Sequence, residues 1–290
     1  MRNFIKHMMS SGILCCVLSC APLSQNNNNS SSTYIFLSHT RTSTNDRIFK
    51  KVYDLNLELY EMTLLGGDLG VDSFQDDFIN HIDSIFNLKS KNTLWSVGNH
   101  DVTTNENFKN LTGKNKYHSY KTNNTTFITL DTQDSLSNIV GKQKQYFLDI
   151  LKNTSSKNII IISHKLIFMD QHPIMDGQIN KVCNGPKGKC DYCHNRNNFQ
   201  HEIYPELVKL KEKGINIIWI GGDLGYKTSS FEYKDLNGII FLGNGFWFKN
   251  KENKVLVLSE DKSSIKYKFV FIDSLIKNQT KEYINHLFEE

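Results

Sequence analysis

Short apolar runs recur along this chain, and each of them stops at glycine or polar residues. The runs lie at residues 34–38, 62–65, 93–97, 126–130, 158–162 and 215–220. Runs of this length between turn-forming residues are typical of buried strands. Segments rich in helix formers or with helical apolar spacing separate them, at 45–61, 72–87, 142–151 and 203–213. The alternation predicts an α/β fold whose strands are largely buried.

The last third of the chain has a different pattern. Short runs at 238–242, 254–259 and 265–272 predict further strands, and residues 281–288 predict a closing helix. Strand–helix units followed by a strand-rich segment predict two packed mixed β-sheets flanked by helices. With 290 residues and 39% hydrophobic content, the chain is long and apolar enough for one such core. Its net charge of +4 includes no basic cluster interleaved with aromatic residues, so no nucleic-acid partner is expected.

The first twenty residues predict an export signal. Arg2, Lys6 and His7 precede an apolar run at 13–18 that is too short to span a bilayer. The sequence Val17-Leu18-Ser19-Cys20 then resembles a bacterial lipobox, in which Cys20 becomes the lipidated first residue of the mature protein.

These features predict the organisation of the whole chain. Residues 1–19 would be the signal peptide, residues 20–33 the lipidated Cys20 and a polar tether, and residues 34–290 the folded domain. The protein would then be exported and anchored by its lipid to the membrane of a bacterial cell envelope. The alternative is an ordinary secretory signal in which Cys20 is incidental.

Polar side chains that can bind metal follow several of the predicted strands. Asp68 follows the second run, Asn99 and His100 follow the third, and His164 follows the run at 158–162. The carboxyl ends of strands in open α/β sheets converge on one crevice. Each residue alone could be an ordinary turn or core residue. Together they supply the oxygen and imidazole ligands that divalent first-row metals favour.

The order of these residues resembles that of the calcineurin-like metallophosphoesterases. That family has Asp-x-His, Gly-Asp, Gly-Asn-His-Asp/Glu, a single His and Gly-His-x-His, each at a strand end. In this chain, Gly67-Asp68, Gly98-Asn99-His100-Asp101 and Ser163-His164 match the three middle blocks. The resemblance extends from about residue 34 to residue 272, and it implies a four-layer αββα fold and metal-dependent phosphoester hydrolysis.

The two outer blocks depart from the family pattern. His39-Thr40-Arg41 stands where the family has Asp-x-His, and Gly222-Asp223-Leu224-Gly225 stands where it has Gly-His-x-His. The two substitutions that cannot bind metal, Arg41 and Gly225, both fall on the family's first metal position. The resemblance therefore implies one divalent ion (Mn, Fe or Zn) rather than two, with these remaining ligands: Asp68, Asn99, His164 and Asp223.

The resemblance also implies roles for the neighbouring side chains. Arg41 would take the place of the first cation and bind the phosphate group, with His39 helping to position it. His100 would donate a proton to the leaving oxygen, with Asp101 orienting its imidazole. The expected partner is a phosphoester substrate. The alternative is an inactive lipoprotein that keeps the scaffold as a binding or structural module, in which Arg41 only pairs with Asp68.

A cysteine cluster lies in a long polar insertion at about 168–200. It contains Cys183, Cys190, Cys193 and His194. Outside the cytoplasm a disulfide is favoured, although three cysteines leave one unpaired, and a Cys/His zinc site is the alternative. Cys190-x-x-Cys193-His194 also fits the haem c attachment pattern, which would indicate an electron-transfer protein. The position of the insertion predicts that it lies over the crevice.

Overall fold

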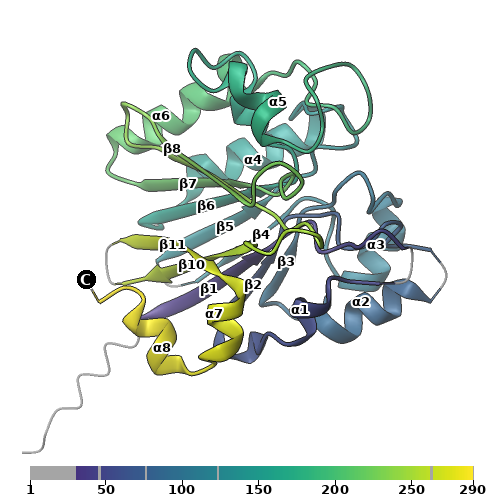
Figure 1. Cartoon of the computed structure of the whole chain (residues 1–290). Coiled ribbons are helices and arrows are strands. Elements are labelled where there is room, and N and C mark those ends of the chain that lie inside the picture. Colours follow the sequence, from purple (N-terminus) through teal and green to yellow (C-terminus); the bar gives the residue numbers. More distant parts are fainter. Residues whose placement is uncertain (1–30, 45–46, 76, 123, 262–263, 290) are drawn as a thin grey trace, which may run out of the picture. The chain divides into compact units, whose positions relative to one another are not determined.

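The computed structural model of this protein describes residues 31–44, 47–75, 77–122, 124–261 and 264–289, which belong to one compact unit, Ser31–Glu290 (Figure 1). The predicted signal peptide and Cys20 lie outside these residues. The predicted tether ends earlier than expected, because Ser32 and Thr33 already pair with Glu260 and Ser259 in a sheet. No helix in the described ranges is long and apolar enough to cross a membrane.

The first sheet has five strands in the order β11-β10-β1-β2-β3. Its strands are β1 (Ser32–Leu37), β2 (Met62–Leu65), β3 (Thr93–Trp95), β10 (Lys254–Glu260) and β11 (Ile265–Phe271). The β1, β2 and β3 strands are parallel, whereas β10 is antiparallel to both of its neighbours. The parallel arrangement brings the carboxyl ends of β1, β2 and β3 to one edge.

The second sheet has six strands in the order β4-β5-β6-β7-β9-β8. Its strands are β4 (His118–Lys121), β5 (Thr125–Thr129), β6 (Asn158–Ser163), β7 (Asn216–Gly221), β8 (Ser230–Lys234) and β9 (Ile240–Asn244). The four central strands are parallel and the two edge strands antiparallel. Every residue of β6 is buried, which explains its run of four isoleucines.

The two sheets pack face to face, and helices cover their outer faces. Alternate residues of β6 separate the two layers: Ile160 and Ile162 pack against Phe36 and Leu64 between the sheets, whereas Ile159 and Ile161 face the helices. The helices over the second sheet are α4 (Gly141–Asn153), α5 (Ile179–Val182) and α6 (Tyr204–Glu212). Those over the first sheet are α1 (Lys50–Tyr53), α2 (Phe78–Phe86), α3 (Asn105–Thr112), α7 (Ile272–Lys277) and α8 (Lys281–His286). The predicted four-layer α/β architecture of two mixed sheets flanked by helices is confirmed.

Local predictions were less accurate than the architecture. The segment 45–61, predicted as a helix, contains only α1 and a 3-10 turn at Leu57–Leu59. The helix predicted from residue 72 begins at Phe78, because Ser73 before it donates its backbone N–H to the carbonyl of His100 at 3.0 Å. The insertion contains short turns of helix at Ile167–Met169, Asp176–Gln178 and Phe199–Ile203. Elements missed by the sequence pattern are β4, β8, α3 and α7.

Candidate functional site

The polar residues at the strand ends of both sheets come together at one edge. Asp68 follows β2 and lies between residues of the two sheets, with its Oδ1 atom 3.5 Å from His164 Nε2 after β6. Its Oδ2 atom lies 3.8 Å from His39 Nε2 and 3.6 Å from Arg41 Nε, both after β1. Asp223 after β7 completes the group, with Oδ1 3.9 Å from His164 Nε2.

The two oxygens of Asp68 divide the site into two sides. We call Asp68 Oδ1, His164 and Asp223 the imidazole side, and Asp68 Oδ2, His39 and Arg41 the arginine side. Asp68, His164 and Asp223 are all nearly inaccessible to solvent, whereas the side chain of Arg41 is 26% exposed. The site is therefore open to solvent on its arginine side.

The loop that carries Asp68 has an uncommon backbone. Asp68 has a φ of 55° and Gly67 a φ of 90°, and a Cβ atom at Gly67 would lie 2.6 Å from the backbone nitrogen of Gly98. His39, on the opposite side of the site, has a φ of 53°. Left-handed backbone at residues other than glycine is uncommon and concentrates at functional sites. Asp68 and His39, whose side chains face each other in the site, are thus both held in costly backbone conformations.

Asp101 has a different role from the one predicted. Its buried carboxylate accepts the backbone N–H groups of Asp68 at 2.6 Å, Leu69 at 3.1 Å and Gly98 at 2.9 Å. The Ser73 hydroxyl also donates to it. Burial and the neighbouring charge of Asp68 raise the pKa of Asp101. Asp101 therefore holds the two glycine-containing loops together and does not orient His100, because its oxygens are occupied behind the site.

Three histidines in the site each carry a proton on the same ring nitrogen, Nδ1. The Nδ1–H groups of His39, His100 and His164 donate to the backbone carbonyls of Phe246, Val71 and Gly66 at 2.8, 2.6 and 2.8 Å. A neutral imidazole that donates from Nδ1 has its lone pair on Nε2. Burial lowers the pKa of His39 to about 4, so that imidazole is neutral at pH 7. Its Nε2 accepts a hydrogen bond from Arg41 Nε at 3.2 Å.

The Nε2 atom of His164 has no such donor. It is completely buried and lacks a hydrogen-bond partner in the described part of the protein, although two carboxylate oxygens lie 3.5 and 3.9 Å away. A lone pair that faces two carboxylates is repelled unless a positive charge lies between them. Two ligand atoms each about 2.1 Å from a tetrahedral ion lie about 3.4 Å apart, close to the separation of His164 and Asp68.

The predicted metal site is nevertheless only partly assembled. Across the described ranges, no cluster of three or more His, Cys, Asp or Glu side chains is arranged as a metal centre. Asp223 lies slightly too far away through Oδ1, and the half-buried Asn99 makes no side-chain hydrogen bond to the group among the described residues. The pair Asp68 and His164 fits one ion on the imidazole side, and the arginine side does not fit a second.

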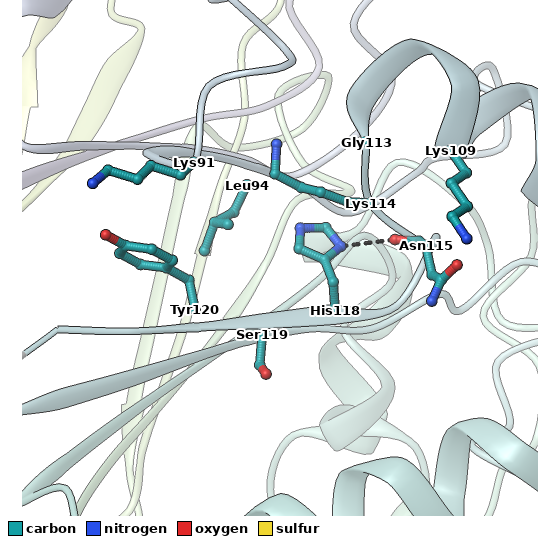
Figure 2. A pocket seen from close by; sticks show the side chains of 9 residues that line it. All are labelled: Lys91, Leu94, Lys109, Gly113, Lys114, Asn115, His118, Ser119 and Tyr120. Carbon is teal, nitrogen blue, oxygen red and sulfur yellow. Dashed lines mark hydrogen bonds between the residues drawn. The ribbon is translucent and has the colours of Figure 1, made fainter.

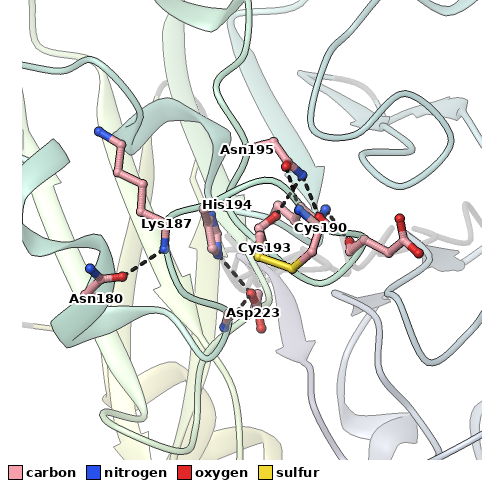
Figure 3. Close-up of a disulfide and its surroundings, with 10 residues drawn as sticks. Asn180, Lys187, Cys190, Cys193, His194, Asn195 and Asp223 are labelled. Atoms are coloured by element: carbon pink, nitrogen blue, oxygen red, sulfur yellow. Dashed lines mark hydrogen bonds and ion pairs between the residues drawn. A yellow bond between two sulfur atoms is a disulfide. The ribbon is translucent and has the colours of Figure 1, made fainter.

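Asp223 is held from the other direction by the insertion. Its Oδ2 accepts a hydrogen bond from His194 Nε2 at 2.9 Å and another from the backbone N–H of Gly185 at 3.3 Å (Figure 3). Burial alone would raise the pKa of Asp223, but the hydrogen bond from His194, together with the nearby imidazoles, outweighs this effect. The net pKa lies well below its usual range. Asp223 is therefore ionised at neutral pH.

The cysteine cluster contains a disulfide rather than a zinc site. Cys190 and Cys193 are bonded to each other, while Cys183 is a buried free thiol. Because both sulfurs of the Cys-x-x-Cys motif are in the disulfide, they bind neither zinc nor haem. Asn195 donates to the carbonyls of Cys190 and Cys193 at 2.9 and 3.1 Å and braces the loop that carries His194. The sequence missed the pairing of His194 with Asp223, since nothing in the motif indicates which way the imidazole points.

The backbone explains why the arginine side lacks the family's last histidine. Gly225 has a φ of 127°, and a Cβ atom there would lie 2.0 Å from the carbonyl oxygen of Phe246. That same carbonyl accepts the hydrogen bond of His39. The loop that positions His39 therefore occupies the space that any side chain at residue 225 would need.

Two hollows on the described surface are lined by histidine and basic side chains. The first, of about 310 Å³, is lined by His39 and Arg41 of the arginine side and by these residues: Thr42, Ser43, Asn184, Tyr226, Trp247 and Phe248. The second, of about 280 Å³, lies where the edge strands β3 and β4 approach each other and includes Lys91, Lys109, Lys114 and His118 (Figure 2). Only the first adjoins the predicted site. Its aromatic wall was not foreseen from the sequence.

The fold is similar to that of a known phosphatase. The crystal structure of a dimetal phosphatase from Danio rerio matches with a TM-score of 0.54 at 12% sequence identity, over 83% of this chain and 96% of that chain. NAD nucleotidase from Haemophilus influenzae matches more weakly, with a TM-score of 0.37 at 13% identity, over 83% of this chain and 49% of that chain. No family model and no curated protein matches the sequence. The chain has a metallophosphoesterase-like fold, which is what a likeness at 12% identity establishes.

Proposed function

We propose that this protein hydrolyses phosphoesters with a single divalent metal ion. The ion would be held by Asp68 and His164, with Asp223 and Asn99 as further ligands. The observation that carries the proposal is the buried Nε2 atom of His164, which has no hydrogen-bond donor among the described residues and faces two carboxylate oxygens. A divalent ion at that position would polarise a phosphoryl oxygen of the substrate.

Arg41 supplies the positive charge on the other side of Asp68. Its Nε atom is fixed by His39 Nε2, and its side chain reaches the open face of the site. A guanidinium group matches the spacing of phosphate oxygens and stays charged at any physiological pH. Arg41 thus binds and orients the phosphate group at the position of the first cation in the family pattern.

His100 stands at the edge of the site as the proton donor. Its backbone N–H donates to Asp68 Oδ1 at 3.0 Å, and its Nδ1–H is fixed on the carbonyl of Val71. The imidazole is therefore oriented by Val71, and its protonated form would carry a second proton, on Nε2, for the leaving oxygen of the substrate. This arrangement is that of a general acid placed by the backbone.

The competing proposal is a binding or structural module that has lost catalysis. The partly assembled metal site and the ion pair between Arg41 and Asp68 favour it. In that case Arg41 replaces the metal outright and Asp68 has only a structural role.

Metal content per chain separates the two proposals. Residues 31–290 would be purified without chelators and compared with His164→Ala and Asp68→Ala, and with His81→Ala as a control for removing an exposed histidine. We expect about one equivalent of Mn, Fe or Zn in the wild type and the control, and none in the two site variants, each checked for folding by circular dichroism. A wild-type protein that remains metal-free after incubation with each ion contradicts the hydrolase proposal.

A further inference from the structure

The hollow beside Arg41 has a charged floor and an aromatic wall. Its volume of about 310 Å³ is lined by the buried His39, by the partly exposed Arg41, and by the three neighbouring rings of Tyr226, Trp247 and Phe248. Ligand pockets of small molecules begin at about this size. The combination offers a cation to one end of a ligand and ring faces to the other.

The guanidinium of Arg41 still has unused donors. Its Nε atom donates to His39 and lies 3.6 Å from Asp68, whereas its two Nη atoms make no hydrogen bond within the described residues. The Nη groups are the ends of the fork that binds two oxygens of a phosphate together. An anion in the hollow would therefore meet two free N–H groups on a side chain that is already fixed at Nε.

The aromatic wall is rigid although it is exposed. Asn253 accepts the backbone N–H of Trp247 at 3.0 Å and donates to its carbonyl at 2.9 Å, and Asn184 accepts the backbone N–H of Tyr226 at 2.8 Å. The rings of Tyr226 and Trp247 pack edge to face at 5.0 Å, and Phe248 follows Trp247 at 6.2 Å.

Such a wall is unusual on a solvent-facing surface. Tyr226 is 59% exposed, and Trp247 beside it is partly exposed. Fixed aromatic rings lose little conformational entropy when a flat ligand covers them, and an aromatic pair adds about 0.5–1.5 kcal/mol beyond simple burial. The wall is thus suited to a planar ring and less suited to a flexible chain.

We propose that the hollow binds a phosphomonoester whose leaving group carries a planar aromatic ring. The phosphate lies on the Nη groups of Arg41 and the ring lies against Trp247 and Tyr226. This inference names a substrate class for the proposed hydrolase and rests on it. In the reaction, the oxygen of water forms a bond to phosphorus and its proton passes to solvent. The phosphorus–oxygen bond to the aromatic alcohol breaks, and that oxygen takes the Nε2 proton of protonated His100, which then regains a proton from solvent.

Binding of phosphonates tests this without turnover, because their carbon–phosphorus bond is not hydrolysed. Benzylphosphonate, cyclohexylmethylphosphonate and methylphosphonate would be titrated into the protein as purified, by calorimetry and by tryptophan fluorescence. Trp247 is partly exposed whereas Trp95 and Trp219 are buried, so a fluorescence change on binding reports on Trp247. We expect benzylphosphonate to bind about fivefold more tightly than the cyclohexyl compound and about twentyfold more tightly than methylphosphonate.

Two variants test the contributions of Arg41 and of the aromatic rings separately. Trp247→Leu should remove the preference for the aromatic ring and leave methylphosphonate binding unchanged. Arg41→Gln should weaken all three ligands by about tenfold, whereas Arg196→Gln, which removes an exposed guanidinium from the insertion, should change none of them.

The outcomes distinguish the inference from the function on which it rests. Equal affinity for the benzyl and cyclohexylmethyl compounds, or no binding of any phosphonate, overturns the inference. Ring-selective binding that depends on Trp247 and Arg41 supports it, even in a protein that binds no metal and hydrolyses nothing. In that last case the proposed hydrolase fails and a binding protein for aromatic phosphates remains.

Discussion

The imidazole side and the arginine side of the site share one carboxylate and satisfy it in different ways. On the arginine side, Asp68 Oδ2 meets a permanent side-chain cation, and His39 Nε2 receives a hydrogen bond from it. On the imidazole side, Asp68 Oδ1 meets His164, whose Nε2 lacks a donor in the described part of the chain. Thus the charge of Asp68 is offset by Arg41 on the arginine side, whereas on the imidazole side the Nε2 atom of His164 still lacks a cation or donor among the described residues.

The difference shows that the departures from the metallophosphoesterase pattern are structurally connected. On the arginine side, hydrogen bonds join Arg41 to His39 and His39 to the carbonyl of Phe246. That carbonyl also lies where a Cβ atom of residue 225 would be, so Gly225 belongs to the same arrangement. The imidazole side keeps residues of the family pattern and gains His194 from the insertion. Three expected results test this contrast.

The largest effect is expected at Gly225, where the backbone of Phe246 fills the space that a side chain would need. A Gly225→Ala variant would place its Cβ 2.0 Å from the Phe246 carbonyl and hold a φ of 127°, which is strained for any residue with a side chain. We expect a loss of roughly 4 kcal/mol or more in the free energy of unfolding, measured with urea.

The matched control is Gly113→Ala, with a φ of 73° and open space around its Cβ position. That variant should lose only about 1 kcal/mol. Similar losses in the two variants would show that the backbone at Phe246 moves easily and does not exclude a side chain at residue 225.

A pH experiment on Asp131 sharpens the contrast, because this buried carboxylate lacks the histidines that surround Asp68. Burial and the neighbouring Asp134 raise the pKa of Asp131 to about 6, although Lys116 lies 3.6 Å away, whereas the pKa of Asp68 is lowered. The folded protein therefore binds the proton of Asp131 more tightly than the unfolded chain does. Its ionisation should cost about 3 kcal/mol of stability as the pH rises from about 4 to about 6.

In Asp131→Asn this cost is absent. The stability of the variant relative to the wild type should therefore rise across that pH range and stay constant above it, as measured by urea unfolding at each pH. A relative stability that falls with rising pH would mean that Lys116, and not burial, sets the pKa of Asp131.

The smallest expected effect separates a functional Arg41 from a purely structural one. If a divalent ion binds on the imidazole side, the guanidinium repels it, and Arg41→Gln should tighten Mn²⁺ binding by about tenfold, or about 1.4 kcal/mol. Calorimetric titration measures this directly, with Arg196→Gln as the control for loss of an exposed charge. An Arg41→Gln variant that is destabilised and binds no Mn²⁺ supports the binding or structural module.

The layers of the fold were predictable from the sequence because burial on both faces leaves a plain signal. The isoleucine run of β6 and the short apolar runs of β1, β2 and β7 indicated buried strands, and these strands lie in the parallel centres of the two sheets. The edge strand β8 was missed because it has no buried apolar run: its residues are half-exposed or exposed, and polar ones alternate with aromatic ones. Its backbone pairs with β9, which the local sequence does not indicate.

The sequence indicated which residues of the site lie together, but it did not indicate what each of them does. Asp68, His164 and Asp223 lie together because they follow parallel strands. The family resemblance implied that Asp101 orients His100, but backbone N–H groups bind its carboxylate instead. His194 approaches Asp223 through a loop whose path depends on the Cys190–Cys193 disulfide and Asn195, and no local sequence preference determines that path.

The contact between Gly225 and the Phe246 carbonyl also limits how this protein can change over generations. A single mutation at residue 225 cannot restore a metal ligand, because the new side chain would collide with a neighbouring backbone segment before it could bind anything. Retreat of that segment alone would remove the acceptor of His39 without any gain. A chain with this arrangement could gain a metal ligand at residue 225 only if several residues changed together.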